Sequence, residues 1–197
     1  MPFQLVVVGA SQGGLHALEV ILPSLPKQLP MALVIAQHRY SFAADHLATY
    51  LRQLSPLPMV EIEDKLALAP GQVYLAPADY HVLIEPGHFA LSTEAPVAHA
   101  RPSINVLFES AADAYGRQVI GLILTGASHD GAQGLSKICA CGGLALVQDP
   151  ATAESQTMPK AAIAAVPTAH VVPLSEIAPL LVNVARAAQS PQALSPP

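Results

Sequence analysis

The feature that constrains this chain most is a series of uninterrupted apolar runs, each long enough for a strand and each followed by a turn. Four such runs are Phe3–Val8, Met31–Gln37, Val119–Leu124 and Leu144–Gln148. A strand with one solvated face would alternate apolar and polar residues, so continuous runs indicate strands that are buried on both faces. Because helical patterns separate these runs, the sequence predicts an α/β fold with a doubly wound, mostly parallel sheet and helices on both faces.

The expected helices are short and end at recognisable signals. Pro23 ends the first helix near Leu22, and a short strand at Val171–Val172 precedes the last helix, which contains Pro179. The helices are expected over about residues 15–22, 42–54, 130–140 and 175–188.

One stretch of the chain breaks this alternation. Between Met59 and Leu91 the strand-like runs are short and lie between turns, which leaves no room for helices. Within it, Val82–Glu85 and Phe89–Leu91 flank a Pro-Gly turn and predict a β-hairpin. We therefore expect a small antiparallel hairpin insertion over about residues 59–91.

Composition excludes several classes of protein. Nine Lys and Arg against 14 Asp and Glu give a net charge of −5, so the chain lacks the basic surface that nucleic-acid binding requires. No apolar run approaches the ~18 residues that span a bilayer, and no basic region precedes an apolar stretch at the N-terminus, as it would in a secretory signal. We expect one cytoplasmic domain over residues 1–188, without membrane insertion, and a flexible tail over 189–197.

The segment Gly9-Ala-Ser-Gln-Gly13 follows the first apolar run and precedes a helix. It fits the G-x-S-x-G nucleophile elbow, in which a sharp turn exposes a serine hydroxyl at the end of a strand. The same residues would also suit a turn that only caps a helix, or a loop that binds phosphate. Against the phosphate loop, the segment is not G-x-G-x-x-G and lacks the lysine of a P-loop.

Two further polar residues follow other strands of the expected sheet. His38 comes directly after the second run, and Asp130 lies in the Gly-containing segment after Val119–Leu124. Open α/β sheets bind their ligands at the carboxyl ends of the strands, where Ser11 is also expected. A carboxylate at Asp130 would accept a hydrogen bond from His38 Nδ1 and fix the tautomer of the ring. The alternative is that Asp130 only caps the helix that follows it.

Taken together in their order, these motifs resemble the catalytic domain of the bacterial chemotaxis protein-glutamate methylesterases, the CheB family. The resemblance runs from about Phe3 to Ala185. Its motifs are Val8-Gly-Ala-Ser-Gln-Gly-Gly14, Gln37-His38, Tyr74-Leu-Ala-Pro77, Arg101-Pro-Ser103, Val106-Leu-Phe108, Leu124-Thr-Gly126, Asp130-Gly131, Gln148-Asp-Pro150 and Met158-Pro159.

The resemblance implies a serine hydrolase that removes methyl esters from glutamate side chains of chemoreceptors and, in some members, deamidates receptor glutamines. The family's nucleophile, base and acid fall on Ser11, His38 and Asp130, and no metal or organic cofactor is implied. The alternatives are a general small-ester hydrolase and a catalytically silent binding module on the same fold.

Three more residues are candidates for the site. The backbone N–H of Gln12, the residue after the nucleophile, is the expected oxyanion donor, with a second donor near Ala127. The family often has Met where Ala127 stands, which predicts a wider pocket. Arg101, just before a helix that Ser103 would cap, is expected to position either a polar substrate or a loop.

The implied partners are the methylated cytoplasmic helices of chemoreceptors. The familiar full-length enzyme also carries an N-terminal receiver domain, whereas Met1 lies almost at the first expected strand. The expectation is a chain without a receiver domain, either a stand-alone member or a fragment. A regulatory receiver would then belong to another chain or to a missing segment.

Overall fold

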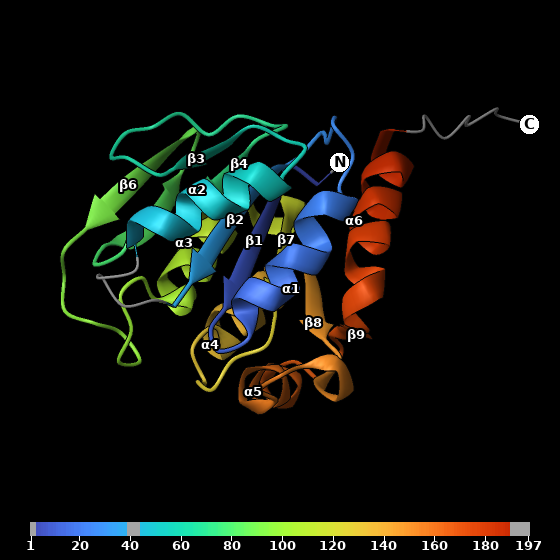
Figure 1. Ribbon diagram of the computed structural model, residues 1–197. Helices are drawn as coiled ribbons and strands as arrows, with labels where there is room; N and C mark the ends of the chain where they lie inside the picture. The colour runs from blue at the N-terminus through green and yellow to red at the C-terminus, as the bar shows by residue number, and fades with distance from the viewer. Residues whose placement is uncertain (1–2, 39–43, 190–197) are drawn as a thin grey trace, which may run out of the picture.

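The computed structural model describes residues 3–38 and 44–189. In this part of the chain seven strands form one sheet in which every neighbouring pair is parallel (Figure 1). In spatial order the strands are β3 (Met59–Glu61), β4 (Val73–Leu75), β2 (Ala32–Gln37), β1 (Leu5–Ala10), β7 (Val119–Ile123), β8 (Leu144–Gln148) and β9 (His170–Val172). The expected doubly wound sheet is confirmed.

Helices cover both faces of this sheet (Figure 1). Because side chains alternate along a strand, β1 sends Val6 and Val8 into one apolar cluster and Leu5 and Val7 into the other. The first cluster is closed by α1 (Gly14–Ile21), α2 (Ala44–Leu54) and α6 (Leu174–Gln189). The second is closed by α3 (Ile104–Tyr115), α4 (Ala132–Ala140) and α5 (Thr157–Ala165).

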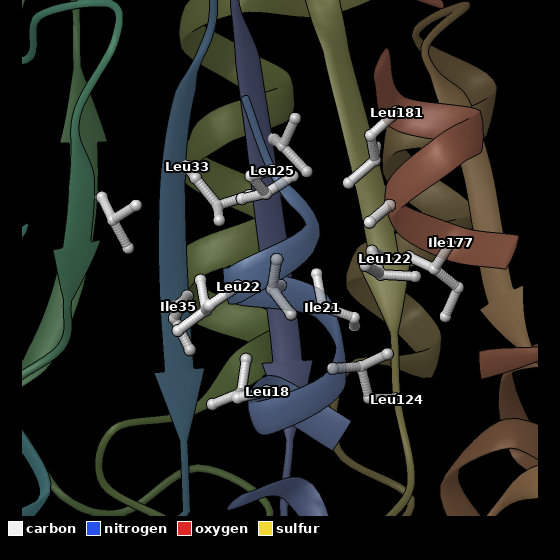
Figure 2. Packing of buried hydrophobic residues seen from close by; sticks show 14 of the residues in the cluster. Leu18, Ile21, Leu22, Leu25, Leu33, Ile35, Leu122, Leu124, Ile177 and Leu181 are labelled. Atoms are coloured by element: carbon white, nitrogen blue, oxygen red, sulfur yellow. The ribbon is translucent and has the colours of Figure 1, made fainter. Parts of the chain in front are cut away.

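The first cluster shows why the strand runs are continuous. Figure 2 shows Leu18 and Ile21 of α1 and Ile177 of α6 packed over Leu33 of β2 and Leu122 of β7. All five side chains are at most 2% exposed. Strands buried on both faces in this way need apolar residues at every position.

The hairpin insertion is smaller than expected. Only β5 (His81–Glu85) and β6 (His88–Ser92) are antiparallel, with Glu85 opposite His88 across a Pro86-Gly87 turn. Strands β3 and β4, which also lie in the 59–91 stretch, join the main sheet in parallel. Residues 62–72 connect these two strands without a helix, as the lack of helical patterns predicted. Their parallel pairing differs from the antiparallel insertion that was expected.

Helix α5 has no counterpart among the expected elements. Pro159 lies in its first turn, where the missing N–H costs no hydrogen bond. Residues 42 and 43 of the expected second helix and residues 190–197 of the expected tail lie outside the described residues. Among the described helices, none is both long and apolar enough to cross a bilayer.

Candidate active site

The candidate site lies at the carboxyl ends of three neighbouring strands. Ser11 follows β1, His38 follows β2, and the segment Thr125–Asp130 follows β7. Backbone hydrogen bonds fix these segments to one another, since Ser11 N donates to Thr125 O at 3.0 Å and His38 N to Ala10 O at 2.9 Å. The strand order therefore places the three chain segments at one edge of the sheet.

A pocket of about 650 Å³ opens at this edge. The sequence candidates Ser11, Gln12, His38, Arg101 and Ala127 all line it. Asp130 has a fully buried side chain and does not line this pocket, but it borders a neighbouring hollow of about 970 Å³. The two hollows share His38 and Ala127, so the polar groups face a continuous concave surface.

His38 and Asp130 are joined directly. The His38 Nε2 atom lies 2.9 Å from Asp130 Oδ2, and the imidazole is only 15% exposed. Because an ionised carboxylate only accepts hydrogen bonds, we assign the hydrogen to Nε2. The expectation that Nδ1 faces Asp130 is therefore wrong. Sequence position does not reveal the side from which the carboxylate approaches the ring.

Asp130 is held by the start of α3. Its Oδ1 accepts hydrogen bonds from Ser103 Oγ and Asn105 N, both at 3.0 Å, and its Oδ2 accepts one from Ile104 N at 2.6 Å. The positive end of the α3 dipole also favours a carboxylate at this position. The N-cap of α4, the helix that follows Asp130 in sequence, is Gly131, without a side-chain hydrogen bond. Asp130 thus binds the N-terminus of a different helix from the one that the capping alternative named.

Two glycines allow the turn at Ser11. Gly13 adopts the left-handed conformation with φ of 78°, which side chains other than glycine rarely take. At Gly126 a Cβ atom would lie 2.8 Å from Ser11 Cβ and would also overlap Met158 Sδ. Only glycine therefore lets the Thr125–Asp130 segment approach the serine this closely.

Gln37 connects the serine turn with the histidine segment. Its Nε2 donates to Ser11 O at 2.8 Å and to His38 O at 2.9 Å, and the residue is 7% exposed. Both partners are carbonyl oxygens, which assigns the amide NH₂ to this side. Sequence reasoning included Gln37 only as part of a motif. A polar amide at the end of an otherwise apolar buried strand was the available signal.

Thr125 makes a similar connection on the other side of the turn. Its Oγ1 donates to Gln12 O at 2.9 Å and accepts from Ser155 N at 2.9 Å. Its backbone N donates to Gln148 Oε1 at 2.8 Å. The turn after Ser11 is therefore fixed by buried polar groups rather than by its own residues alone.

Gln12 and Ala127 lie in the two segments that Ser11 N joins by its hydrogen bond to Thr125 O. Neither of their backbone N–H groups donates a hydrogen bond to another residue of the described chain. Both residues are exposed and line the pocket. Two unpaired N–H groups beside a serine are suited to binding a negatively charged oxygen.

Arg101 lines the pocket but is bound to a loop. Its Nη1 donates to Thr93 O at 2.8 Å and to Glu94 O at 3.0 Å. Of its two expected roles, the contacts therefore favour positioning of a loop. Ser103 caps α3 as expected, with its side chain accepting from Val106 N. Among the described residues, no group of three or more His, Cys, Asp or Glu side chains is arranged to hold a metal ion.

Comparison of the sequence with known proteins finds a matching family model and several relatives. The family model described as CheB methylesterase matches residues 6–181. A putative protein-glutamate methylesterase/protein-glutamine glutaminase of Leptospira interrogans is 44% identical over 185 residues, which cover 93% of this chain and 96% of that protein. The protein-glutamate methylesterase FrzG of Myxococcus xanthus is 35% identical over 92% of this chain and 55% of its own length.

A solved structure agrees with the sequence relatives. The CheB methylesterase catalytic domain of Thermotoga maritima superimposes with a TM-score of 0.89 at 32% identity. The match covers 93% of this chain and all of that domain.

Proposed function

The chain belongs to the CheB methylesterase family of carboxylic ester hydrolases, and on that premise we propose that it demethylates glutamate side chains of chemoreceptors. In this proposal Ser11 is the nucleophile, His38 the general base and Asp130 the acid that orients His38. The observation that carries it is the 2.9 Å hydrogen bond between His38 Nε2 and Asp130, beside a pocket that Ser11 lines.

The first half of the reaction forms an acyl-enzyme. His38 Nδ1, the nitrogen opposite the Asp130 contact, takes the proton from Ser11 as Oγ attacks the ester carbonyl. Asp130 stabilises the imidazolium that results and keeps the ring in one tautomer. The C–O bond of the ester then breaks, and methanol leaves with the proton from His38.

The oxyanion is held by backbone groups. We assign this role to the N–H of Gln12 and the N–H of Ala127. Each such donor contributes about 3–4 kcal/mol to stabilisation of the transition state. Water then attacks the acyl-enzyme with His38 again as base, which releases Ser11 and the glutamate carboxylate.

Deamidation of glutamine follows the same course with ammonia as the leaving group. The Leptospira relative carries the glutaminase name beside the methylesterase name. A side-chain amide has the same carbonyl geometry as the methyl ester, so the same serine, histidine and oxyanion donors apply.

The proposed partners are cytoplasmic helices of methylated receptors. With a net charge of −5, the chain is poorly suited to attract an acidic helix over long range. Esterification removes the charge of the modified glutamate and lessens this repulsion. We propose that residues 1–188 act as one catalytic domain, which works weakly unless a partner such as a receiver domain tethers or activates it.

The test is mass spectrometry of a methylated receptor cytoplasmic fragment that is incubated with the wild type and with Ser11→Ala. We expect loss of methyl groups with the wild type only, and an unchanged circular dichroism spectrum for the variant. Loss of methyl groups with both proteins would remove Ser11 from the reaction. An unmodified fragment together with rapid turnover of small esters would indicate a general esterase, and no turnover at all would indicate a silent binding module.

A further inference from the structure

His81 is a buried histidine that the proposed reaction does not use. It is the first residue of β5, is 2% exposed and does not line the pocket. Its Nδ1 accepts a hydrogen bond from Ser103 N at 3.2 Å, and its Nε2 lies 3.1 Å from Ala95 O. Since a backbone N–H only donates and a carbonyl only accepts, these partners assign one neutral tautomer with the hydrogen on Nε2.

The partner at Nδ1 leads to the proposed catalytic groups. Ser103 is the N-cap of α3, and its Oγ donates to Asp130 Oδ1 at 3.0 Å. The other oxygen of Asp130 binds His38. A continuous series of hydrogen bonds therefore runs from His81 through Ser103 and Asp130 to His38.

The partner at Nε2 leads to the wall of the pocket. Ala95 directly precedes Pro96, which lines the pocket together with His99 and Ala100. Arg101 binds the carbonyls of Thr93 and Glu94 from the other end of the same segment. The segment that forms this wall is thus attached at its start by two side chains, His81 and Arg101.

We infer that His81 is a positioning residue that aligns the orienting carboxylate through Nδ1 and the substrate-binding wall through Nε2. The inference rests on the proposed function, because it assigns those roles to Asp130 and to the pocket. One imidazole then fixes two parts of the site relative to each other, and the two nitrogens contribute to different kinetic constants.

Three substitutions separate the two nitrogens. In His81→Asn the side-chain oxygen takes the place of Nδ1 and keeps the acceptor for Ser103 N. In His81→Gln the amide nitrogen reaches the place of Nε2 and keeps the donor for Ala95 O. His81→Phe fills the space of the imidazole and removes both the acceptor for Ser103 N and the donor for Ala95 O. His88→Phe, on β6 of the same hairpin and partly exposed, is the matched control.

Methanol release from a methylated receptor fragment then gives kcat and KM for each variant. We expect His81→Asn to keep kcat and raise KM, and His81→Gln to keep KM and lower kcat. His81→Phe should lose about 10²-fold in kcat/KM, the scale on which small displacements of catalytic groups act. His88→Phe should match the wild type. Unchanged constants in His81→Phe, or equal losses in the Asn and Gln variants, would overturn the inference.

A second readout does not depend on turnover. The ¹⁵N shifts of the His38 ring should move in His81→Gln and His81→Phe but not in His81→Asn. If wild-type protein does not release methanol, the proposed function fails while this measurement still decides the role of His81. His38 shifts that stay the same in all three variants would refute that role.

Discussion

Asp130 makes more hydrogen bonds than orientation of one histidine requires. Besides His38, its carboxylate binds Ser103 Oγ and the backbone N–H groups of Ile104 and Asn105. The group that is proposed to orient the base therefore also fixes the start of α3. At the scale of single residues, catalysis and local stability depend on the same buried side chain.

Asp130→Asn is expected to lose activity and some stability while still folding. Turnover should fall by about 10⁴, by analogy with the tautomer effect in serine proteases. Because an amide cannot accept all of these hydrogen bonds, unfolding should also become easier by about 1–3 kcal/mol. The rate of methanol release, taken well below the melting temperature of the variant, measures the loss of turnover. Urea unfolding measures the loss of stability.

The control for this variant is Asp113→Asn. Asp113 lies on α3, the helix whose start Asp130 binds, but it is exposed and pairs with Lys137. We therefore expect Asp113→Asn to keep the turnover of the wild type. If Asp130→Asn changes turnover only a few-fold, Asp130 serves α3 alone and another carboxylate orients His38.

His38 should set the rate of the chemical step. Because it takes the Ser11 proton in the proposed reaction, His38→Ala should lower kcat by about 10²–10⁴-fold, the usual contribution of a general base. The rate of methanol release at saturating substrate measures this, with His129→Ala as the control. Activity of His38→Ala within a few-fold of the wild type would move the base elsewhere, and exposed His129 in the neighbouring hollow would be examined first.

At the scale of elements, Tyr74 attaches the hairpin to the sheet. It lies on β4, and its ring packs against Phe89 of β6 with the ring centroids 4.8 Å apart. Its hydroxyl accepts a hydrogen bond from Ala69 N at 2.9 Å and lies 2.5 Å from Gln72 Oε1. Burial raises the pKa of Tyr74 above its ordinary value, and the hydrogen bond from Ala69 opposes this in part.

This raised pKa predicts loss of stability at alkaline pH. The folded state favours the protonated phenol, so its contribution is complete below the ordinary pKa of about 10 and is lost as the pH rises through the folded value. Tyr74→Phe should cost about 1–2 kcal/mol at neutral pH and weaken the alkaline dependence. Urea unfolding at neutral and at alkaline pH measures both effects, with Tyr80→Phe, at an exposed tyrosine, as the control. Equal alkaline dependence in wild type and Tyr74→Phe would contradict it.

The long buried strands could be predicted because their apolar runs are uninterrupted. Strands β1, β2, β7 and β8 were found within a few residues for this reason. Strands β3 and β4 have only three residues each, and these short runs do not specify the parallel pairing of the two strands at this end of the sheet. Helix α5 has only nine residues and no side-chain N-cap, so its sequence carries no strong signal for a helix.

At the scale of the whole molecule, parallel topology brings Ser11, His38 and Asp130 to one edge of the sheet. That edge could be predicted, since all parallel strands end on the same side. The contacts between residues at that edge could not be predicted. The use of Nε2 rather than Nδ1 and the bonds from α3 to Asp130 depend on how segments distant in sequence approach one another.

The most direct test of the central claim is the rate at which a fluorophosphonate labels Ser11. The wild type, His38→Ala and Asp130→Asn are treated in parallel, and peptide mass spectrometry locates the label. The account predicts rapid labelling at Ser11 in the wild type and labelling slower by at least about 10²-fold in both variants, because each removes part of the activation of the serine. A wild type that is not labelled at Ser11, or three equal rates, would contradict it.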